Sequence, residues 1–148
     1  MTFTDKNNHL TVLLSGVIDR ILLYRQFSPR SKEAGGVLIG ERRGPHLVIK
    51  RISEPSVGDK RTRHSVDRCG PGHQTAVDEA FAQSDGTLQY LGEWHTHPED
   101  LPSPSPTDEY SWMKNIICSE PMIVIIVGRK RIWAGKKIGR TISHLIEI

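Results

Sequence analysis

Residues Met122–Val127 form the longest uninterrupted apolar run of the chain. Positions 123–127 are all β-branched, and such side chains favour the extended backbone of a β-strand. The run is far shorter than the ~20 residues that a membrane-spanning helix needs. The sequence therefore predicts a strand here, and this segment does not predict a membrane helix.

Other segments supply helices and strands around this run. Apolar residues at helical spacing predict a first helix over residues 12–26, which Ser28 and Pro29 would end. A second helix is expected from Gly72 to the turn at residues 85–86, and a third after the proline-rich loop at residues 98–106. Further strands are expected over residues 34–40, 46–52, 88–97, 131–134 and 141–148. This order argues for an α/β or α+β fold, with helices packed on a single sheet.

The apolar residues of the second and third helices define their expected buried faces. In the second helix these are Val77, Ala80 and Phe81. In the third they are Trp112, Met113, Ile116 and Ile117, with Cys118 as a small buried neighbour in the same helix.

The length and composition are those of an ordinary globular protein. The chain has 148 residues, of which 36% are hydrophobic and 25% charged, so we expect one domain over residues 1–148. Its two cysteines do not make a disulfide framework, and the first residues lack the basic region of a signal peptide. We therefore expect a cytoplasmic protein.

The charge distribution leaves nucleic acid as a weak alternative partner. A net charge of +3 is too small to indicate nucleic acid by itself. Residues 129–131 and 136–137 are basic and are expected to decorate an exposed hairpin, which could meet an acidic partner. No aromatic residues alternate with these basic residues, so base stacking has little support.

Two histidines end the strand expected over residues 88–97. His95 and His97 lie two positions apart, and side chains at that spacing in a strand point to the same face. Two imidazoles placed side by side can bind one metal ion, although isolated histidines near a loop are usually only solvated. Glu93 shares this face, whereas Trp94 and Thr96 are expected to point into the core.

A carboxylate follows at the start of the third helix. Pro106 is suited to the first helical position and Ser105 to the N-cap, which places Asp108 in the first turn. Ser-x-x-Asp is also close to an ordinary capping box, so the pattern has a purely structural interpretation. Two histidines and one aspartate together suit tetrahedral Zn²⁺ with one position open.

These residues and their spacing resemble the signature of the JAMM (MPN+) metalloprotease family. The matching pattern is Glu33-x-x-Gly-x-Leu-x-Gly, then His95-x-His97-Pro98, then Ser105-x-x-Asp108. The family implies a cytidine-deaminase-like mixed β-sheet flanked by about three helices. It also implies zinc-dependent hydrolysis of isopeptide or peptide bonds after the tail of ubiquitin or a ubiquitin-like protein.

The resemblance assigns a role to each of the five residues. His95, His97 and Asp108 would bind one zinc ion. Glu33 would deprotonate the attacking water and then protonate the leaving amine, and Ser105 would hydrogen-bond the oxyanion. With all five present, a non-catalytic MPN-type interaction module is the less favoured interpretation.

The segments around the motif resemble the short bacterial branch of the family. Members of that branch occur in antiphage (CBASS-type) defence operons beside an E1/E2-like conjugating enzyme and a cGAS-like nucleotidyltransferase. The resemblance implies that the protein removes the nucleotidyltransferase from its conjugates. Another ubiquitin-like or sulfur-carrier protein is the alternative substrate.

Residues 57–72 are expected to form an insertion or flap loop near the cleft. His64, Cys69 and His73 could suggest a second metal, but their uneven spacing and the missing fourth ligand disfavour one. Arg61, Arg63 and Arg68 are candidates for substrate contact, with solvated charge as the alternative.

Overall fold

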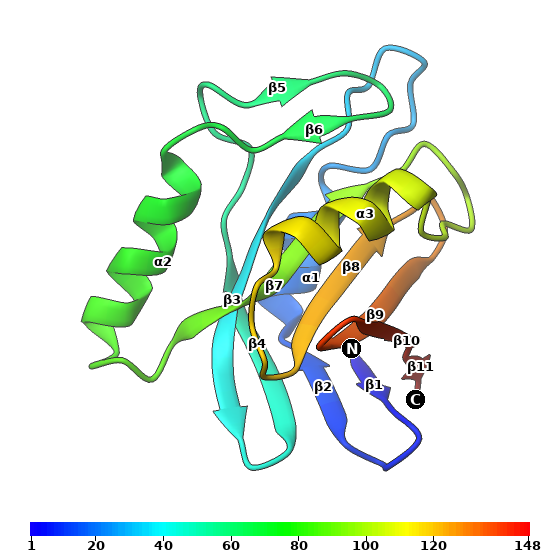
Figure 1. Ribbon diagram of the computed structural model, residues 1–148. Coiled ribbons are helices and arrows are strands. Elements are labelled where there is room, and N and C mark those ends of the chain that lie inside the picture. Colours follow the sequence, from blue (N-terminus) through cyan, green and yellow to red (C-terminus); the bar gives the residue numbers. More distant parts are fainter.

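A mixed nine-stranded sheet forms the body of the protein in the computed structural model, which describes residues 1–148 (Figure 1). Its strands are β1 (Thr2–Thr4), β2 (Leu10–Leu13), β3 (Gly35–Arg43), β4 (His46–Ile52), β7 (Gln89–Thr96), β8 (Met122–Val127), β9 (Ile132–Ile138), β10 (Thr141–His144) and β11 (Ile146–Glu147). The helices are α1 (Ser15–Leu22), α2 (Gly72–Gln83) and α3 (Pro106–Asn115). A separate hairpin consists of β5 (Lys60–Arg61) and β6 (Val66–Asp67). The expected α+β class is confirmed.

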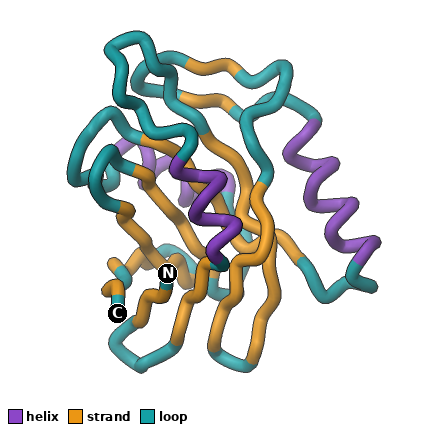
Figure 2. Tube along the Cα trace, turned by 180° about the vertical axis from the view of Figure 1, so that it is seen from behind, coloured by secondary structure: helices purple, strands orange, loops and turns teal.

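The apolar run at Met122–Val127 is β8, and all of its residues are buried. It pairs in parallel with β7 and antiparallel with β9. Alternate side chains enter different cores: Ile123, Ile125 and Val127 join the core that contains α1, whereas Met122, Val124 and Ile126 pack with Trp112 of α3. Figure 2 shows α1 on the face of the sheet opposite to α3, with α2 standing to one side.

The sheet is curled, and one chain segment, which contains β10 and β11, connects its two ends. The strand order is β10-β9-β8-β7-β3-β4-β2-β1-β11, so β10 and β11 lie at opposite ends of it. Only the buried Leu145 separates these two strands in the chain. Asp5 and Lys136 form an ion pair of 2.8 Å between the β1–β2 turn and β9, which adds a second link. In Figure 1 the strands β1, β10 and β11 accordingly gather near both termini.

Helix α1 is shorter at both ends than the helix predicted over residues 12–26. Leu10–Leu13 forms β2 instead, and Val12 is the parallel partner of Val48 on β4. Because this pairing joins distant parts of the chain, the local apolar spacing that predicted a helix does not reveal it. Strand β1 was likewise not predicted.

The other helices follow the prediction with local corrections. Helix α2 begins at Gly72 as expected and buries Ala80, but Phe81 is 52% exposed. Helix α3 ends before Ile117 and Cys118, so neither is helical. Ile117 is 90% exposed, and the expectation that it contacts the core was wrong.

The basic residues at positions 136 and 137 were expected on an exposed hairpin, and this expectation was also wrong. Lys136 and Lys137 are buried on β9. Their amines have partners: Lys136 pairs with Asp5, and Lys137 Nζ donates to the carbonyls of Ile116 and Gly139 at 2.9 and 2.6 Å. Paired amines of this kind tolerate burial that an unpaired ammonium does not.

None of the helices has the length and the hydrophobicity that a membrane-spanning helix requires.

Candidate metal centre

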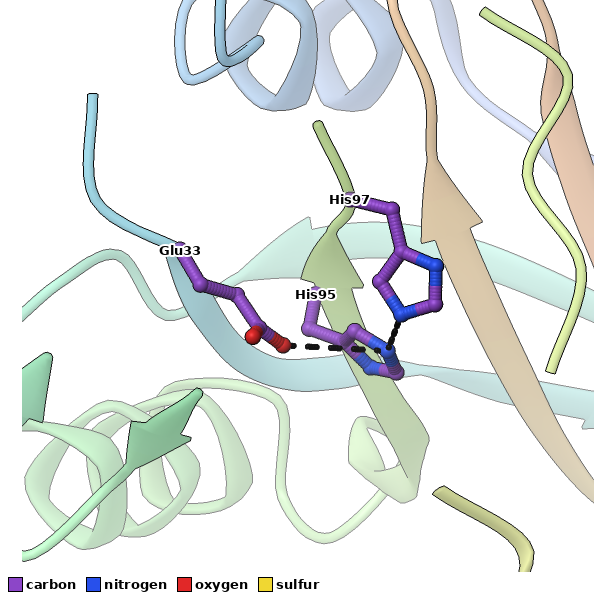
Figure 3. A group of neighbouring side chains, drawn as sticks. All are labelled: Glu33, His95 and His97. Carbon is purple, nitrogen blue, oxygen red and sulfur yellow. Dashed lines mark hydrogen bonds and ion pairs between the residues drawn. The ribbon is translucent and has the colours of Figure 1, made fainter. Parts of the chain in front are cut away.

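The two histidines predicted to share a face do so at the end of β7. His95 and His97 point toward each other, with their Nε2 atoms 3.1 Å apart (Figure 3). Trp94 and Thr96 alternate with them and are buried on the other side, as expected. The neighbours of His95 across the sheet are Gly35 on β3 and Ile126 on β8, so the site stands on central strands.

Asp108 reaches both histidines from the first turn of α3. Its Oδ1 lies 3.2 Å from His95 Nε2, and its Oδ2 lies 3.1 Å from His97 Nε2. The same carboxylate completes a capping box, since Oδ2 accepts from the Ser105 N–H at 2.9 Å and Ser105 Oγ accepts from the Asp108 N–H at 3.0 Å. The structural and the metal-site interpretations of Ser-x-x-Asp are therefore compatible, because one side chain satisfies both.

Glu33 lies two residues before β3 and is 4% exposed, with its Oε1 3.8 Å from His95 Nε2. Figure 3 shows its carboxylate directed at the two imidazoles. Glu33, His95 and His97 each offer one ligand atom, and these atoms lie within 4.8 Å of one another. The chain thus brings together side chains that are more than sixty positions apart in the sequence.

The electrostatics of the site separate its two carboxyl groups. Burial raises the pKa of Glu33 from its ordinary 4.5 to about 7, although the nearby histidines act against this rise. Burial also acts to raise the pKa of Asp108, but the hydrogen bonds with His95 and His97 outweigh it and hold that pKa well below its usual range. For His97, burial acts to lower the pKa, and the bond with Asp108 outweighs it, so the pKa is raised. One carboxyl group is therefore firmly ionised, and the other can exchange a proton near neutral pH.

The donor atoms fit a small tetrahedral cation. Ligands at the Zn–N distance of 2.0–2.1 Å on a tetrahedron are about 3.3 Å apart. The contacts among the two imidazole nitrogens and the Asp108 carboxylate are 3.1–3.2 Å, which is close to that spacing. Two nitrogens and a carboxylate oxygen are also a donor set that zinc accepts.

Trp112 supports the site from α3. It is buried, and its ring lies 5.9 Å from that of His95. On its far side Trp133 stacks against it at 6.0 Å, and His144 stacks on Trp133 at 5.4 Å. A series of aromatic rings therefore connects His95 with the surface at β10.

A cleft of about 330 Å³ opens beside these residues. We define the flap as residues 57–71, which include β5 and β6. The cleft lies between the flap and α3, and its lining includes Val66, Asp67, Ser111, Trp112 and Asn115 besides the site itself. The flap therefore borders the cleft, as the sequence predicted. Ser105 and His97 line a second, adjoining hollow with His64.

The flap arginines and Glu93 make contacts within the protein. Arg68 forms an ion pair with Glu93, and both residues line the cleft together with His95. Arg61 and Arg63 donate to the backbone carbonyls of Glu33 and Ser28, both at 2.8 Å. Each of these three arginines therefore has a partner in the chain, and Arg68 and Arg63 also line the cleft and the hollow beside it. Substrate contact by these arginines stays a prediction.

The possible second metal group at His64, Cys69 and His73 does not assemble. The three residues form no metal-binding group in the structure. His73 is buried and lies between Ser53 Oγ at 2.6 Å and the Asp59 carboxylate at 2.9 Å. Cys69 is exposed. Sequence proximity alone suggested this group.

The fold and the site define the class of protein. The family model of prokaryotic homologues of the JAB domain matches residues 18–136, and the chain belongs to this family. The resemblance to JAMM (MPN+) proteins is therefore confirmed. The chain is similar in fold to a protein of Desulfitobacterium hafniense solved in solution, with a TM-score of 0.64 and 18% identity over 90% of this chain and 88% of that one.

Curated relatives are more similar in sequence. A protein of Vibrio cholerae named CD-NTase/cGAS isopeptidase is 55% identical over 137 residues, which are 93% of this chain and 88% of the relative. One of the same name from Escherichia coli is 52% identical over 98% of this chain and 93% of the relative. A third, from Pseudomonas aeruginosa, is 34% identical over 87% of this chain and 84% of the relative.

The structure also reveals buried polar residues that the sequence analysis did not single out. Gln26 is fully buried and hydrogen-bonds to Thr96, the residue between the two histidines. No local motif marks a glutamine after a short helix. A buried amide becomes recognisable only once the surrounding chain is in place.

Proposed function

We propose that the protein is a zinc isopeptidase that releases a cGAS-like nucleotidyltransferase (CD-NTase) from the proteins to which its C-terminal tail is joined. The observation that carries the proposal is the convergence of His95, His97 and Asp108 beside the buried carboxyl group of Glu33. The name of the relatives at 52–55% identity supports the substrate. An E1/E2-like enzyme that forms the conjugate is the functional partner that this reaction requires.

His95, His97 and Asp108 would hold the zinc ion. Asp108 is suited to this because its carboxylate stays ionised and its position is set by the capping box with Ser105. His97 Nδ1 lies 2.8 Å from Glu99 Oε1, and such an outer partner orients a ligating imidazole. When bound, zinc polarises a carbonyl group and makes hydroxide available from water near neutral pH.

Glu33 would carry the proton between water and the leaving group. The buried carboxylate lies beside the proposed metal site, where it could accept a proton from the attacking water and then donate it to the amine that departs. The 3.8 Å distance to His95 Nε2 leaves the carboxylate beside the proposed metal site.

Ser105 would stabilise the oxyanion. Its Oγ accepts a hydrogen bond from the Asp108 N–H, which leaves its own O–H free to donate. A hydroxyl group directed at developing negative charge stabilises the transition state more than the substrate.

The cleft between the flap and α3 would receive the substrate tail. An extended tail can pair with the edge of a strand, and the main-chain hydrogen bonds then hold the scissile bond in register. The hairpin β5–β6 is the strand pair that borders this cleft. A folded tail that is cleaved without unfolding would contradict this mode of binding.

The test is cleavage of a defined conjugate. A CD-NTase joined through its C-terminal carboxyl group to a lysine of a carrier protein is incubated with the zinc-loaded protein, and intact masses are measured. We expect release of the carrier, and loss of that release in Glu33→Gln and after chelation. Glu79→Gln on the exposed face of α2 is the matched control and should cleave normally.

The alternatives give different results in the same assay. Cleavage of a ubiquitin-like or sulfur-carrier conjugate, with the CD-NTase conjugate left intact, would replace the substrate and keep the chemistry. Full activity in Glu33→Gln would refute the role of Glu33. Absence of both cleavage and bound zinc would favour a non-catalytic interaction module.

A further inference from the structure

The flap is bonded to both backbone groups of Glu33. The N–H of Glu33 donates to the carbonyl of Thr62 at 2.7 Å, and its carbonyl accepts from Arg61 Nε at 2.8 Å. The backbone that carries the proposed proton carrier is therefore attached to the element that borders the substrate cleft. A displacement of the flap would move Glu33 with it.

The next residue is bonded to the opposite side. The N–H of Ala34 donates to Thr96 Oγ1 at 2.9 Å, and the N–H of Thr96 donates to the Ala34 carbonyl at 2.9 Å. Thr96 lies between His95 and His97 and is completely buried. Residues 33–34 therefore connect the flap on one side with the end of the histidine strand on the other.

Gln26 joins these two sides through its side chain. Its Nε2 donates to the carbonyls of Ser31 and Arg63 at 3.1 and 2.8 Å, so one hydrogen bond reaches the flap directly. Its Oε1 accepts from the hydroxyl of Thr96 at 2.7 Å. Both donor hydrogens and an acceptor position of this buried amide are thus used, and an uncharged amide offers two donor hydrogens and an acceptor oxygen on one planar group.

We propose that Gln26 is a positioning residue for the hydrolysis. Its amide fixes the flap relative to the strand end that carries His95 and His97. Because the flap is bonded to the backbone of Glu33, Gln26 thereby also fixes the position of Glu33 beside the two histidines. The inference rests on the proposed function in that Glu33 is taken as the proton carrier. Gln26 itself forms no hydrogen bond to a proposed metal ligand and does not line the cleft. Its effect would pass through Thr96 and the flap.

Substitutions at Thr96 separate this coupling from simple packing. Thr96→Val keeps the shape but removes the hydroxyl, which leaves Gln26 Oε1 without its donor and the Ala34 N–H without its acceptor. Thr96→Ser restores the hydroxyl and is the conservative variant. Ile49→Ala, in the core on β4, is the control for general loss of stability.

The experiment measures amide hydrogen exchange and steady-state kinetics on the zinc-loaded, full-length protein. In Thr96→Val and Gln26→Met we expect one zinc per chain and exchange at residues 60–66 raised about tenfold, as one lost buried hydrogen bond implies. We expect kcat for the CD-NTase conjugate to fall about tenfold to a hundredfold, since small displacements of reacting groups have effects of that size. Thr96→Ser, which keeps the hydroxyl, should give wild-type values in both measurements. In the double variant of Thr96→Val and Gln26→Met, the decrease in kcat should be smaller than the sum of the two single effects expressed as free energies.

The exchange and the kinetics test different parts of the proposal. An exchange rate at residues 60–66 that stays at the wild-type value in Thr96→Val refutes the coupling, whatever the activity. An equal rise of this exchange rate in Ile49→Ala refutes it as well. A wild-type kcat in Gln26→Met with a loosened flap refutes the positioning role. If the wild-type protein does not cleave the conjugate while Thr96→Val still loosens the flap, the proposed substrate fails and the coupling stands.

Discussion

Replacement of Glu33 by glutamine should stabilise the metal-free protein at alkaline pH. The carboxyl group is buried, with its side chain 6% exposed, and its pKa is raised to about 7. Below pH 4.5 the group is protonated in the folded and the unfolded chain, so it has no effect on the free energy of unfolding. As the pH rises from 4.5, the unfolded chain releases the proton first, and the folded state becomes less stable until the pH exceeds about 7.

The size of this effect follows from the pKa difference. One pKa unit corresponds to about 1.4 kcal/mol. The difference between 4.5 and about 7 therefore amounts to about 3 kcal/mol at most, all of it lost by pH 8. Glutamine has nearly the same shape without the charge, so Glu33→Gln should recover most of this free energy at pH 8 and almost none at pH 4.5. For a chain of this length the recovery corresponds to a rise in Tm of about 6–12 °C.

The assay is denaturant unfolding of chelator-treated protein at pH 4.5 and pH 8. Glu79→Gln, on an exposed position of α2, is the control and should change the free energy of unfolding little at either pH. A difference below about 0.5 kcal/mol between wild type and Glu33→Gln at pH 8, the size usual for a surface substitution, would show that the Glu33 carboxyl group is solvated. The argument for proton exchange near neutral pH would then fail.

Three further predictions concern the metal, the oxyanion and the ends of the sheet. Asp108→Ala should lose tightly bound zinc, measured by elemental analysis, because it removes a carboxylate shared by two imidazoles. Ser105→Ala should keep zinc but lower kcat about 10²–10³-fold, and a fully active variant would exclude the oxyanion role. Asp5→Asn should destabilise the protein at pH 7 by breaking the pair with Lys136. Since the pKa of Asp5 is lowered from 3.8 to about 2, this difference in unfolding free energy should shrink as the pH falls below 3.8 and vanish below about 2.

Local patterns were enough for the parts of the fold that depend on local chemistry. The β-branched run of β8, the strand at His46–Ile52 and the start of α2 at Gly72 all lie where the sequence predicted them. The i, i+2 spacing of His95 and His97 and the cap at Ser105 likewise follow from local rules, and the structure brings these residues to one place.

Pairing between distant segments accounts for what the sequence did not disclose. Val12 and Leu13 were expected to begin the first helix, but they belong to β2, which pairs with β1 and β4. The positions of Lys136 and Lys137 look like a solvated basic turn until Asp5 and the carbonyl of Ile116 are in place around their amines. The connection from Gln26 to Thr96 spans residues from different elements, and no local rule predicts it.

The segment from Thr141 to Glu147 also sets an order of events during synthesis. Its first half pairs with β9, and its second half pairs with β1, which leaves the ribosome more than 130 residues earlier. Until this segment emerges, β1 and β9 each present an unpaired edge, and open edges of this kind invite association with other chains. Contacts between such distant residues are also slow to form. The nascent chain therefore remains vulnerable to aggregation until residues 141–147 close the sheet.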